Sequence, residues 1–386
     1  MTAMTVCDAD VLPASPNSPL VVVYVSCHGF GHAARASIAL RELRRLAPRV
    51  RILVRSATPD WLYPDDVLRV PIQGDVGVLQ ADSLSMLIDE TIVRAAEFER
   101  SRPALVAAEV AALAPLQPAI IVGDIPPLAS DVAAELGVAG VAIGNFSWDW
   151  IYAHLGSTQP ELSDLVTSII ASERRTTRLL RLPFFTDMSA FPATEDVPLL
   201  ARVSRADRSA TRRRLGLPTD RPVVLISYGG FAFDRLDPAS LGAVPEVTFV
   251  TTTTLHGAVP SNVVTLPLES STYHDVLAAC DAVMMKPGYG TTSDCLANRV
   301  PMIYTGRPGF GEEEVLVEAM WRLGRAVPLP PEELFAGNIR SAVEAALASE
   351  APWAEIRLDG GTVIAQRILE LANLADHVDP ACTLRT

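Results

Sequence analysis

Residues 281–294 read DAVMMKPGYGTTSD and place an apolar run, a glycine-containing turn and the start of a helical pattern in direct succession. A short continuous apolar run is typical of a strand buried on both faces of a parallel sheet. Gly288 and Gly290 let the backbone approach a ligand closely, and the N–H groups at a helix start favour an anion. The segment therefore predicts a strand–turn–helix unit that cradles phosphate.

The polar groups of this segment suit a phosphorylated ligand. Thr291, Thr292 and Ser293 add hydroxyl donors, and Asp294 is expected to accept hydrogen bonds from ribose hydroxyls. Lys286 precedes the turn and is the one lysine among the 32 basic residues. The alternative interpretation is an ordinary helix N-cap after a tight turn. The segment is not a P-loop, because the G-K-[ST] ending is missing.

A second unit of the same kind reads LVVVYVS at 20–26 and CHGFGHAAR at 27–35. Parallel α/β sheets bind ligands at the carboxyl ends of their strands, near the point where the strand order reverses. That position makes His32 the candidate general base. His28 flanks the same turn and is its competitor.

Asp124 is the candidate partner of His32. It directly follows the apolar strand 119–123, whose carboxyl end belongs to the same edge of the sheet. A carboxylate there can orient an imidazole that accepts a proton. The alternative is a simple helix cap before Pro126.

Alternating apolar strands and helical segments predict two Rossmann-like doubly wound α/β domains that face a cleft. The proline-containing stretch 182–198 interrupts the alternation, so we expect the interdomain linker there. The expected division is an N-terminal tail at 1–19, a first domain at 20–190, a second domain at 199–358 and a C-terminal helical segment at 359–386. Whether that last segment crosses back to the first domain is left open.

Composition restricts the class of protein. A hydrophobic content of 49% excludes a disordered chain, and a net charge of −13 argues against a protein that binds nucleic-acid phosphates. No apolar run approaches the ~20 residues of a membrane span, and the N-terminus lacks the pattern of a secretory signal. Five dispersed cysteines without a C-x-x-C pair favour a cytoplasmic location. No cluster of residues predicts a metal site.

Two further segments are weaker candidates. SYGG at 227–230 ends the first strand of the second half and is a candidate flank for phosphate, with a plain tight turn as the equal alternative. NFSWDW at 145–150 combines aromatic and polar side chains, which suits an acceptor wall or a core cluster. Trp148 and Asp149 therefore join His28 as acceptor-side candidates.

These motifs resemble those of nucleotide-sugar glycosyltransferases of the two-Rossmann (GT-B) fold. The G-x-G-H turn is similar to that of the bacterial enzyme that adds N-acetylglucosamine to the lipid-linked cell-wall precursor. PGYGTTSD at 287–294, NRVPM at 298–302 and FGEE at 310–313 follow the order of the donor-binding signature of plant natural-product glycosyltransferases. The strongest resemblance, at GFGHAAR (29–35), NFSWDWIYA (145–153) and KPGYGTTSD, is to the glycosyltransferase-like N-terminal region of plant arabinokinases.

The resemblance implies roles for individual residues. His32 corresponds to the catalytic base and Asp124 to its orienting carboxylate. Asp294 stands where the family has a ribose-binding glutamate, and two glutamates stand where an Asp-Gln pair holds the sugar hydroxyls of the donor. The donor-binding residues so implied or expected are Gly31, Gly229, Gly230, Lys286, Gly288, Tyr289, Gly290, Thr291, Thr292, Asp294, Glu312 and Glu313.

The activity implied is that of an inverting, metal-independent glycosyltransferase. Its co-substrate is a nucleoside-diphosphate sugar such as a UDP sugar, with no bound cofactor. Its acceptor is a small molecule or a lipid-linked group, reached without a membrane span but with peripheral membrane contact allowed. A nucleotide-sugar 2-epimerase-like enzyme and a non-catalytic sugar-nucleotide binding module are the alternatives. The acceptor, the sugar, the base and the oligomeric state stay open.

Overall fold

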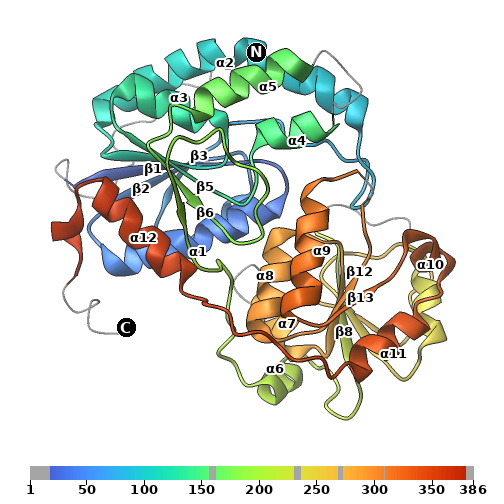
Figure 1. Cartoon of the computed structure of the whole chain (residues 1–386). Helices are drawn as coiled ribbons and strands as arrows, with labels where there is room; N and C mark the ends of the chain where they lie inside the picture. Colours follow the sequence, from blue (N-terminus) through green and yellow to red (C-terminus); the bar gives the residue numbers. More distant parts are fainter. Residues whose placement is uncertain (1–17, 156–161, 230–235, 268–272, 308, 380–386) are drawn as a thin grey trace. The chain divides into compact units, whose positions relative to one another are not determined.

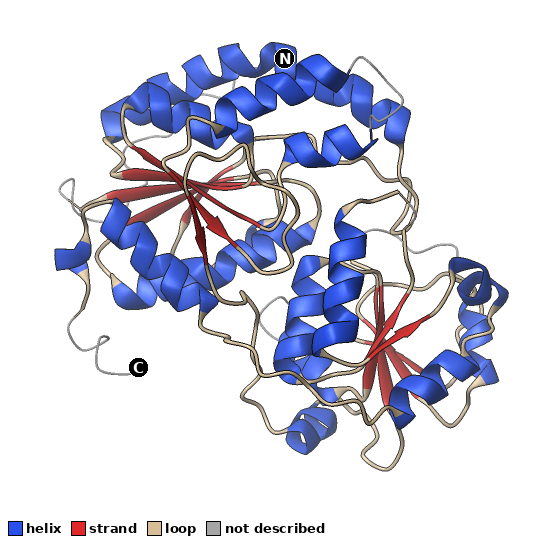
Figure 2. Cartoon of the chain, viewed as in Figure 1, coloured by secondary structure: helices blue, strands red, loops and turns tan. Residues whose placement is uncertain are grey.

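The computed structural model describes residues 18–155, 162–229, 236–267, 273–307 and 309–379 (Figure 1). The chain divides into two compact units. Unit 1 comprises Met1–Leu79, Ile88–Leu200 and Arg357–Thr386, and unit 2 comprises Gln80–Leu87 and Ala201–Ile356. Each unit is a layer of strands covered by helices (Figure 2). Within the described ranges, no helix is both long enough and apolar enough to cross a bilayer.

Unit 1 contains a seven-stranded parallel sheet with the order β3-β2-β1-β4-β5-β6-β7. Its strands are β1 (Leu20–Val25), β2 (Arg51–Arg55), β3 (Leu68–Val70), β4 (Ile120–Asp124), β5 (Ala139–Gly144), β6 (Arg178–Arg181) and β7 (Thr194–Asp196). Its α-helices are α1 (Phe30–Leu46), α2 (Ile88–Leu113), α3 (Pro127–Leu136), α4 (Trp148–Leu155), α5 (Leu162–Glu173) and α12 (Gly360–Leu371). Its 3-10 turns are η2 (Asp60–Leu62), η3 (Ala114–Leu116) and η5 (Ala375–His377).

Unit 2 contains a six-stranded parallel sheet with the order β10-β9-β8-β11-β12-β13. Its strands are β8 (Val223–Ser227), β9 (Thr248–Thr251), β10 (Val263–Thr265), β11 (Ala282–Met285), β12 (Met302–Tyr304) and β13 (Ala326–Pro328). Its helices are α6 (Arg208–Arg214), α7 (Tyr273–Ala279), α8 (Tyr289–Asn298), α9 (Glu312–Leu323), α10 (Pro331–Ala336), α11 (Arg340–Ala348) and the 3-10 turn η4 (Pro238–Ala243).

The predicted fold class, two Rossmann-like α/β domains, is confirmed. The strands are apolar on both faces because helices cover both: every residue of β1 and of β11 is buried. The strand order reverses between β1 and β4 in unit 1, and between β8 and β11 in unit 2. The loops after β1 and β11, which carry the two glycine turns, therefore lie at the topological switch points where such sheets bind ligands.

The domain limits differ in detail from the expected ones. The stretch 182–198 is not a free linker, because Thr194–Asp196 pairs with β6 as the edge strand β7, and the chain leaves unit 1 after Leu200. The segment Gln80–Leu87, which lies between β3 and α2, belongs to unit 2. Its Leu84 is buried in the hydrophobic core of unit 2.

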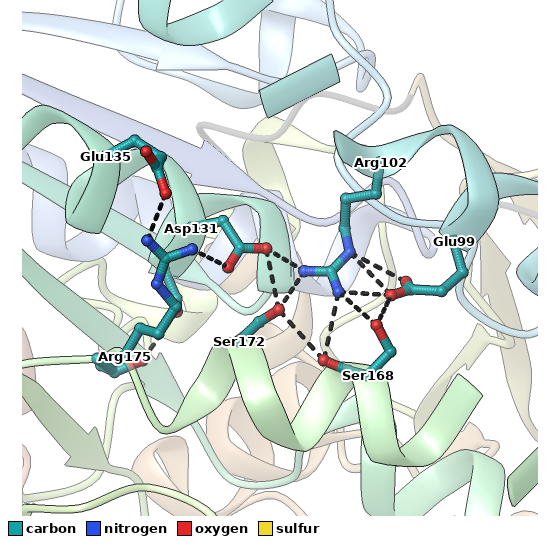
Figure 3. A network of polar contacts seen from close by, with 9 residues as sticks. Glu99, Arg102, Asp131, Glu135, Ser168, Ser172 and Arg175 are labelled. Atoms are coloured by element: carbon teal, nitrogen blue, oxygen red, sulfur yellow. Dashed lines mark hydrogen bonds and ion pairs between the residues drawn. The ribbon is translucent and has the colours of Figure 1, made fainter. Parts of the chain in front are cut away.

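The outer helices of unit 1 are joined by a buried polar network around Arg102 of α2 (Figure 3). The guanidinium of Arg102 donates to Asp131 of α3 and to Ser172 of α5. Arg175 donates to the other oxygen of Asp131 at 3.0 Å. Each charge has an opposite partner, as burial of ionised groups requires. The network fixes α2, α3 and α5 on one face of the sheet, and α1 and α12 lie on the other face (Figure 1).

Helix α12 returns to unit 1 and packs against α1. Thr362 donates a hydrogen bond to Glu42 at 3.0 Å. Gly360 comes so close to the chain before unit 2 that a Cβ atom there would lie 2.4 Å from the carbonyl oxygen of Pro198. Backbone cannot move aside as a flexible side chain can, so this contact requires glycine.

We expect Gly360→Ala to lower the free energy of unfolding by about 1–3 kcal/mol, because the added methyl group overpacks the contact with Pro198. Denaturant titration followed by circular dichroism measures the change. The matched control is Gln366→Ala on the exposed side of the same helix, expected to stay within about 0.5 kcal/mol. Equal stability of the two variants would contradict the packing described for α12.

Candidate functional site

His32 lies in the first turn of α1, directly after the glycine turn. Gly29, which precedes the helix, has φ of 74°, a left-handed conformation that favours glycine. His32 is buried, with 5% of its surface exposed. Its Nδ1 atom lies 2.8 Å from Oδ1 of Asp124 at the carboxyl end of β4. The sequence therefore predicted this pair of residues in contact, and the structure brings them together.

Asp124 also accepts hydrogen bonds from Arg35. Arg35 follows His32 by three residues and so lies on the same face of α1. Arg35 Nε lies 2.7 Å and 3.0 Å from the two carboxylate oxygens, and Nη2 lies 2.5 Å from Oδ1. Its Nη1 donates to Oδ1 of Asn145 at 2.7 Å. Burial raises the pKa of Asp124, but the Arg35 charge and the hydrogen bonds from His32 and Arg35 outweigh it and hold the pKa below its usual value. Asp124 is therefore ionised.

Aromatic rings surround His32. The ring centroids of Phe146 and Trp148 lie 5.7 Å and 6.2 Å from that of His32. Trp148 is 1% exposed, so it is a buried packing residue in this conformation. His28 contacts Trp148 edge-on at 5.4 Å, and its Nδ1 accepts the N–H of Val78 at 3.2 Å. The two histidines thus differ in the partner of Nδ1, which is a backbone N–H for His28 and a carboxylate for His32.

Asp75 is a buried carboxyl group of this site that sequence reasoning missed. It accepts hydrogen bonds from Ser26 Oγ at 3.0 Å and from Trp148 Nε1 at 2.8 Å. Burial raises its pKa, against the effects of His32, Ser26 and Trp148. The only sequence signal is its position after Gly74 in a stretch without periodicity.

Asp149, an acceptor-side candidate, belongs to a different set of contacts. It accepts a hydrogen bond from Ser147, two residues earlier. Burial, followed by the charge of Asp149, raises the pKa of Glu173 at the end of α5 well above its usual value. The structure thus places Asp149 beside Glu173 and gives no contact between Asp149 and His32 within the described ranges.

In unit 2 the glycine turn leads into α8 as predicted. Gly288 caps the helix in an extended conformation, and its carbonyl accepts the N–H of Thr292 at 3.0 Å. Tyr289 is buried, whereas Gly290 and Thr291 are half-buried. The hydroxyl groups of Thr292 and Ser293 are buried and have no hydrogen-bond partner among the described residues. The first turn of α8 therefore holds two buried hydroxyl groups without a partner among the described residues.

Lys286 lies beside Gly229, where an added Cβ would be 3.4 Å from its Cε atom. Gly229 has φ of 91°, and Gly230 lies outside the described residues. Lys286 Nζ donates to Oε1 of Gln80 at 3.4 Å. Burial, and after it the charge of Arg307, lowers the pKa of Lys286 from 10.5 to about 7, whereas the charges of Asp82 and Glu312 oppose the shift.

Asp294 is held by an ion pair that the sequence did not predict. Its Oδ1 accepts the backbone N–H of Arg202 at 2.8 Å, and its Oδ2 accepts Arg202 Nε at 2.9 Å and Nη2 at 2.5 Å. Only 2% of Asp294 is exposed. The carboxylate of Asp294 thus binds the segment at Arg202, where the chain enters unit 2. The expected contact of Asp294 with a ribose stays a prediction.

The two glutamates that begin α9 occupy different positions. Glu313 Oε2 accepts the backbone N–H of Arg307 at 2.5 Å, and burial raises the pKa of Glu313 despite that bond. Glu312 is 4% exposed, and its charge acts on Lys286 and Arg307. Arg307, which sequence reasoning missed, packs over the ring of Phe310 at 4.2 Å. Within the described residues, no group of three metal-binding side chains gathers.

We expect Lys286 to titrate near pH 7 and its proton to be retained on binding a nucleoside diphosphate, because the anion favours the ammonium form. Affinity should then fall as the pH rises through about 7. Lysine is present once in the chain, so NMR of protein labelled with ¹³Cε-lysine gives one signal, and Lys286→Met identifies it. A midpoint near the ordinary 10.5 would contradict the burial described here.

Comparisons with known proteins agree with this architecture. The chain is 29% identical over 385 aligned residues to the L-arabinokinase of Arabidopsis thaliana, covering 96% of this chain and 36% of that protein. It is 30% identical over 154 residues to a UDP-N-acetylglucosamine–N-acetylmuramyl-(pentapeptide) pyrophosphoryl-undecaprenol N-acetylglucosamine transferase of Rhodococcus erythropolis, covering 36% of this chain and 40% of that protein. The chain thus spans less than half of either relative. No protein-family model matches it.

Solved structures show the same fold. The glycotransferase of kitacinnamycin superimposes with a TM-score of 0.59 at 17% identity, covering 94% of this chain and 96% of that one. A UDP-glucosyltransferase from Polygonum tinctorium superimposes with a TM-score of 0.56 at 16% identity, covering 94% and 95%. These likenesses confirm the expected resemblance to arabinokinase and to the cell-wall N-acetylglucosaminyltransferases, and the chain has the GT-B fold of glycosyltransferases.

Proposed function

We propose that the chain is an inverting, metal-independent glycosyltransferase that moves a sugar from a nucleoside-diphosphate sugar to an acceptor hydroxyl. The observation that carries the proposal is the contact between His32 and Asp124 at the switch point of the first sheet. A histidine whose Nδ1 faces an ionised carboxylate has its Nε2 available to accept a proton. The GT-B fold and the glycosyltransferase relatives support this choice.

The reaction follows from these groups. His32 takes the proton of the acceptor hydroxyl, and the oxygen forms a bond to the anomeric carbon on the face opposite the nucleotide. The bond between that carbon and the diphosphate oxygen breaks, and the electron pair leaves with the diphosphate. The N–H groups at the start of α8 and the ammonium group of Lys286 stabilise that charge.

The co-substrate we propose is a uridine or thymidine diphosphate sugar. Solved structures of the same fold include VinC in complex with dTDP and a plant enzyme in complex with UDP. The acceptor is a small molecule or a lipid-linked group, since a relative is named for a pyrophosphoryl-undecaprenol substrate. We propose no bound cofactor.

His32→Ala should lower turnover at least ~100-fold with donor binding nearly unchanged, because a general base typically contributes 10²–10⁴-fold. Asp124→Asn should give a smaller loss. Activity is measured as nucleoside diphosphate released from a panel of UDP and dTDP sugars with mixed acceptors. His28→Gln is the matched control on the same turn and should retain most activity. Full activity of His32→Ala together with loss in His28→Gln would transfer the base role to His28.

Lys286→Met should weaken binding of UDP or dTDP by roughly ten- to a hundredfold, the loss expected of one charge-assisted hydrogen bond. Isothermal titration calorimetry measures the affinity of each nucleotide. Binding without turnover in the parent protein would indicate a sugar-nucleotide binding module. Conversion of the donor sugar without an acceptor would indicate an epimerase. Unchanged affinity in Lys286→Met would remove Lys286 from the donor site.

A further inference from the structure

Arg35 is a buried cation that the proposed reaction does not use directly. It is 3% exposed, and its Nε and Nη2 atoms contact the carboxylate of Asp124 side-on. Its Nη1 donates to Asn145, which in turn donates from Nδ2 to the carbonyl of Phe184 at 3.3 Å. Arg35 therefore links α1 to the end of β4 and to the loops after β5 and β6.

The position of Arg35 also determines what His32 experiences. Its Nη2 lies 3.1 Å from His32 Nδ1, and both nitrogens face Oδ1 of Asp124. An arginine has only donors, and an ionised carboxylate has only acceptors. The 2.8 Å contact between His32 and Asp124 is a hydrogen bond only when Nδ1 carries the proton. That tautomer leaves the lone pair on Nε2.

The charges beside the ring also bear on its protonation. A single buried carboxylate within about 4–6 Å favours the imidazolium form of a histidine, typically by 1–3 pH units. Arg35 is permanently charged and opposes that field, so His32 faces an ion pair rather than a lone carboxylate. The other titratable groups that face the ring are Asp75, whose carboxyl is bonded to Ser26 and Trp148, and His28, whose ring centroid is 6.3 Å away.

We propose that Arg35 is a positioning residue for the transfer reaction: by orienting and neutralising Asp124, it holds His32 as the neutral Nδ1–H tautomer with Nε2 ready to accept a proton. This rests on the proposed role of His32 as the base. Arg35 touches no reacting atom in this scheme and acts through Asp124.

The test is NMR of protein labelled with ¹⁵N-histidine, which reports the tautomer and the titration of each ring without any need for activity. His32→Gln identifies the His32 signals among the six histidines. We expect the parent protein to show the Nδ1–H tautomer. Arg35→Met should move the titration midpoint of His32 up by about 1–3 pH units, since Asp124 is then uncompensated. Arg35→Lys keeps the positive charge, so its His32 midpoint should equal that of the parent protein.

Arg35→Met leaves a buried carboxylate without its partner, so a second comparison does not depend on the folding of that variant. Asp124→Asn leaves Arg35 unopposed and should move the midpoint down. The double variant Arg35→Met/Asp124→Asn has no charge at either position, and its midpoint should lie about 1–3 pH units above that of Asp124→Asn. Coincident midpoints in these two variants, or an Nε2–H tautomer in the parent protein, would overturn the proposal.

Kinetics separate this proposal from the proposed function. In Arg35→Met, turnover at neutral pH should fall at least tenfold and recover as the pH is raised, with the KM for the donor unchanged. If the NMR midpoints shift as expected but His32→Ala is fully active, Arg35 controls the ring while the base assignment is wrong. If His32→Ala is inactive and the midpoints do not shift, the base assignment stands and the role of Arg35 fails.

Discussion

The ion pair between Arg35 and Asp124 is the interaction on which the candidate site depends. Asp124 ends a fully buried strand, and an ionised carboxylate at that depth needs an opposite charge and hydrogen bonds. Arg35 provides both, and its Nη1 donates to Asn145, which follows β5. The pair therefore joins α1, β4 and the loop after β5. Removing one member would cost about 3–5 kcal/mol, because the other charge would be left buried and unpaired.

Much of this arrangement follows from the sequence. Two continuous apolar strands, each ending in a polar residue, predict that the loop after β1 and the end of β4 share one sheet edge. The parallel register, in which Val25 pairs with Asp124, accounts for the meeting of His32 and Asp124. The role of Arg35 was also within reach, since a spacing of three residues on a helix puts it on the same face as His32.

Other parts of the site were not predictable because they depend on contacts between irregular segments. Asp294 and Arg202 are 92 residues apart, and no periodicity links them. Asp75 and Gln80 come from a stretch with little regular structure, so nothing in the pattern shows that the first contacts Trp148 or that the second contacts Lys286. The expectation of a linker at 182–198 was wrong because proline residues also occur beside short edge strands such as β7.

The segment Gln80–Leu87 belongs to unit 2, although it lies in the sequence between two elements of unit 1. It contributes Leu84 to the hydrophobic core of unit 2, which also contains Tyr228 and Met284. That anchor places Gln80 and Asp82 near Lys286, so a loop between β3 and α2 provides part of its surroundings.

Lys286 and Arg35 lie in sites with different electrostatic requirements. Arg35 balances the buried carboxylate of Asp124 and must remain charged, and a guanidinium does not titrate in the pH range of proteins. Lys286 has a compact ammonium group on a flexible stem, which fits against Gly229 and can lose its proton when buried. A lysine whose pKa is about 7 is partly neutral at neutral pH, and a bound anion would favour its charged form. An arginine at position 286 would stay charged in either state, so its burial would be costly whenever the anion was absent. This difference gives a physical reason for lysine at position 286 in a chain whose other basic residues are all arginine.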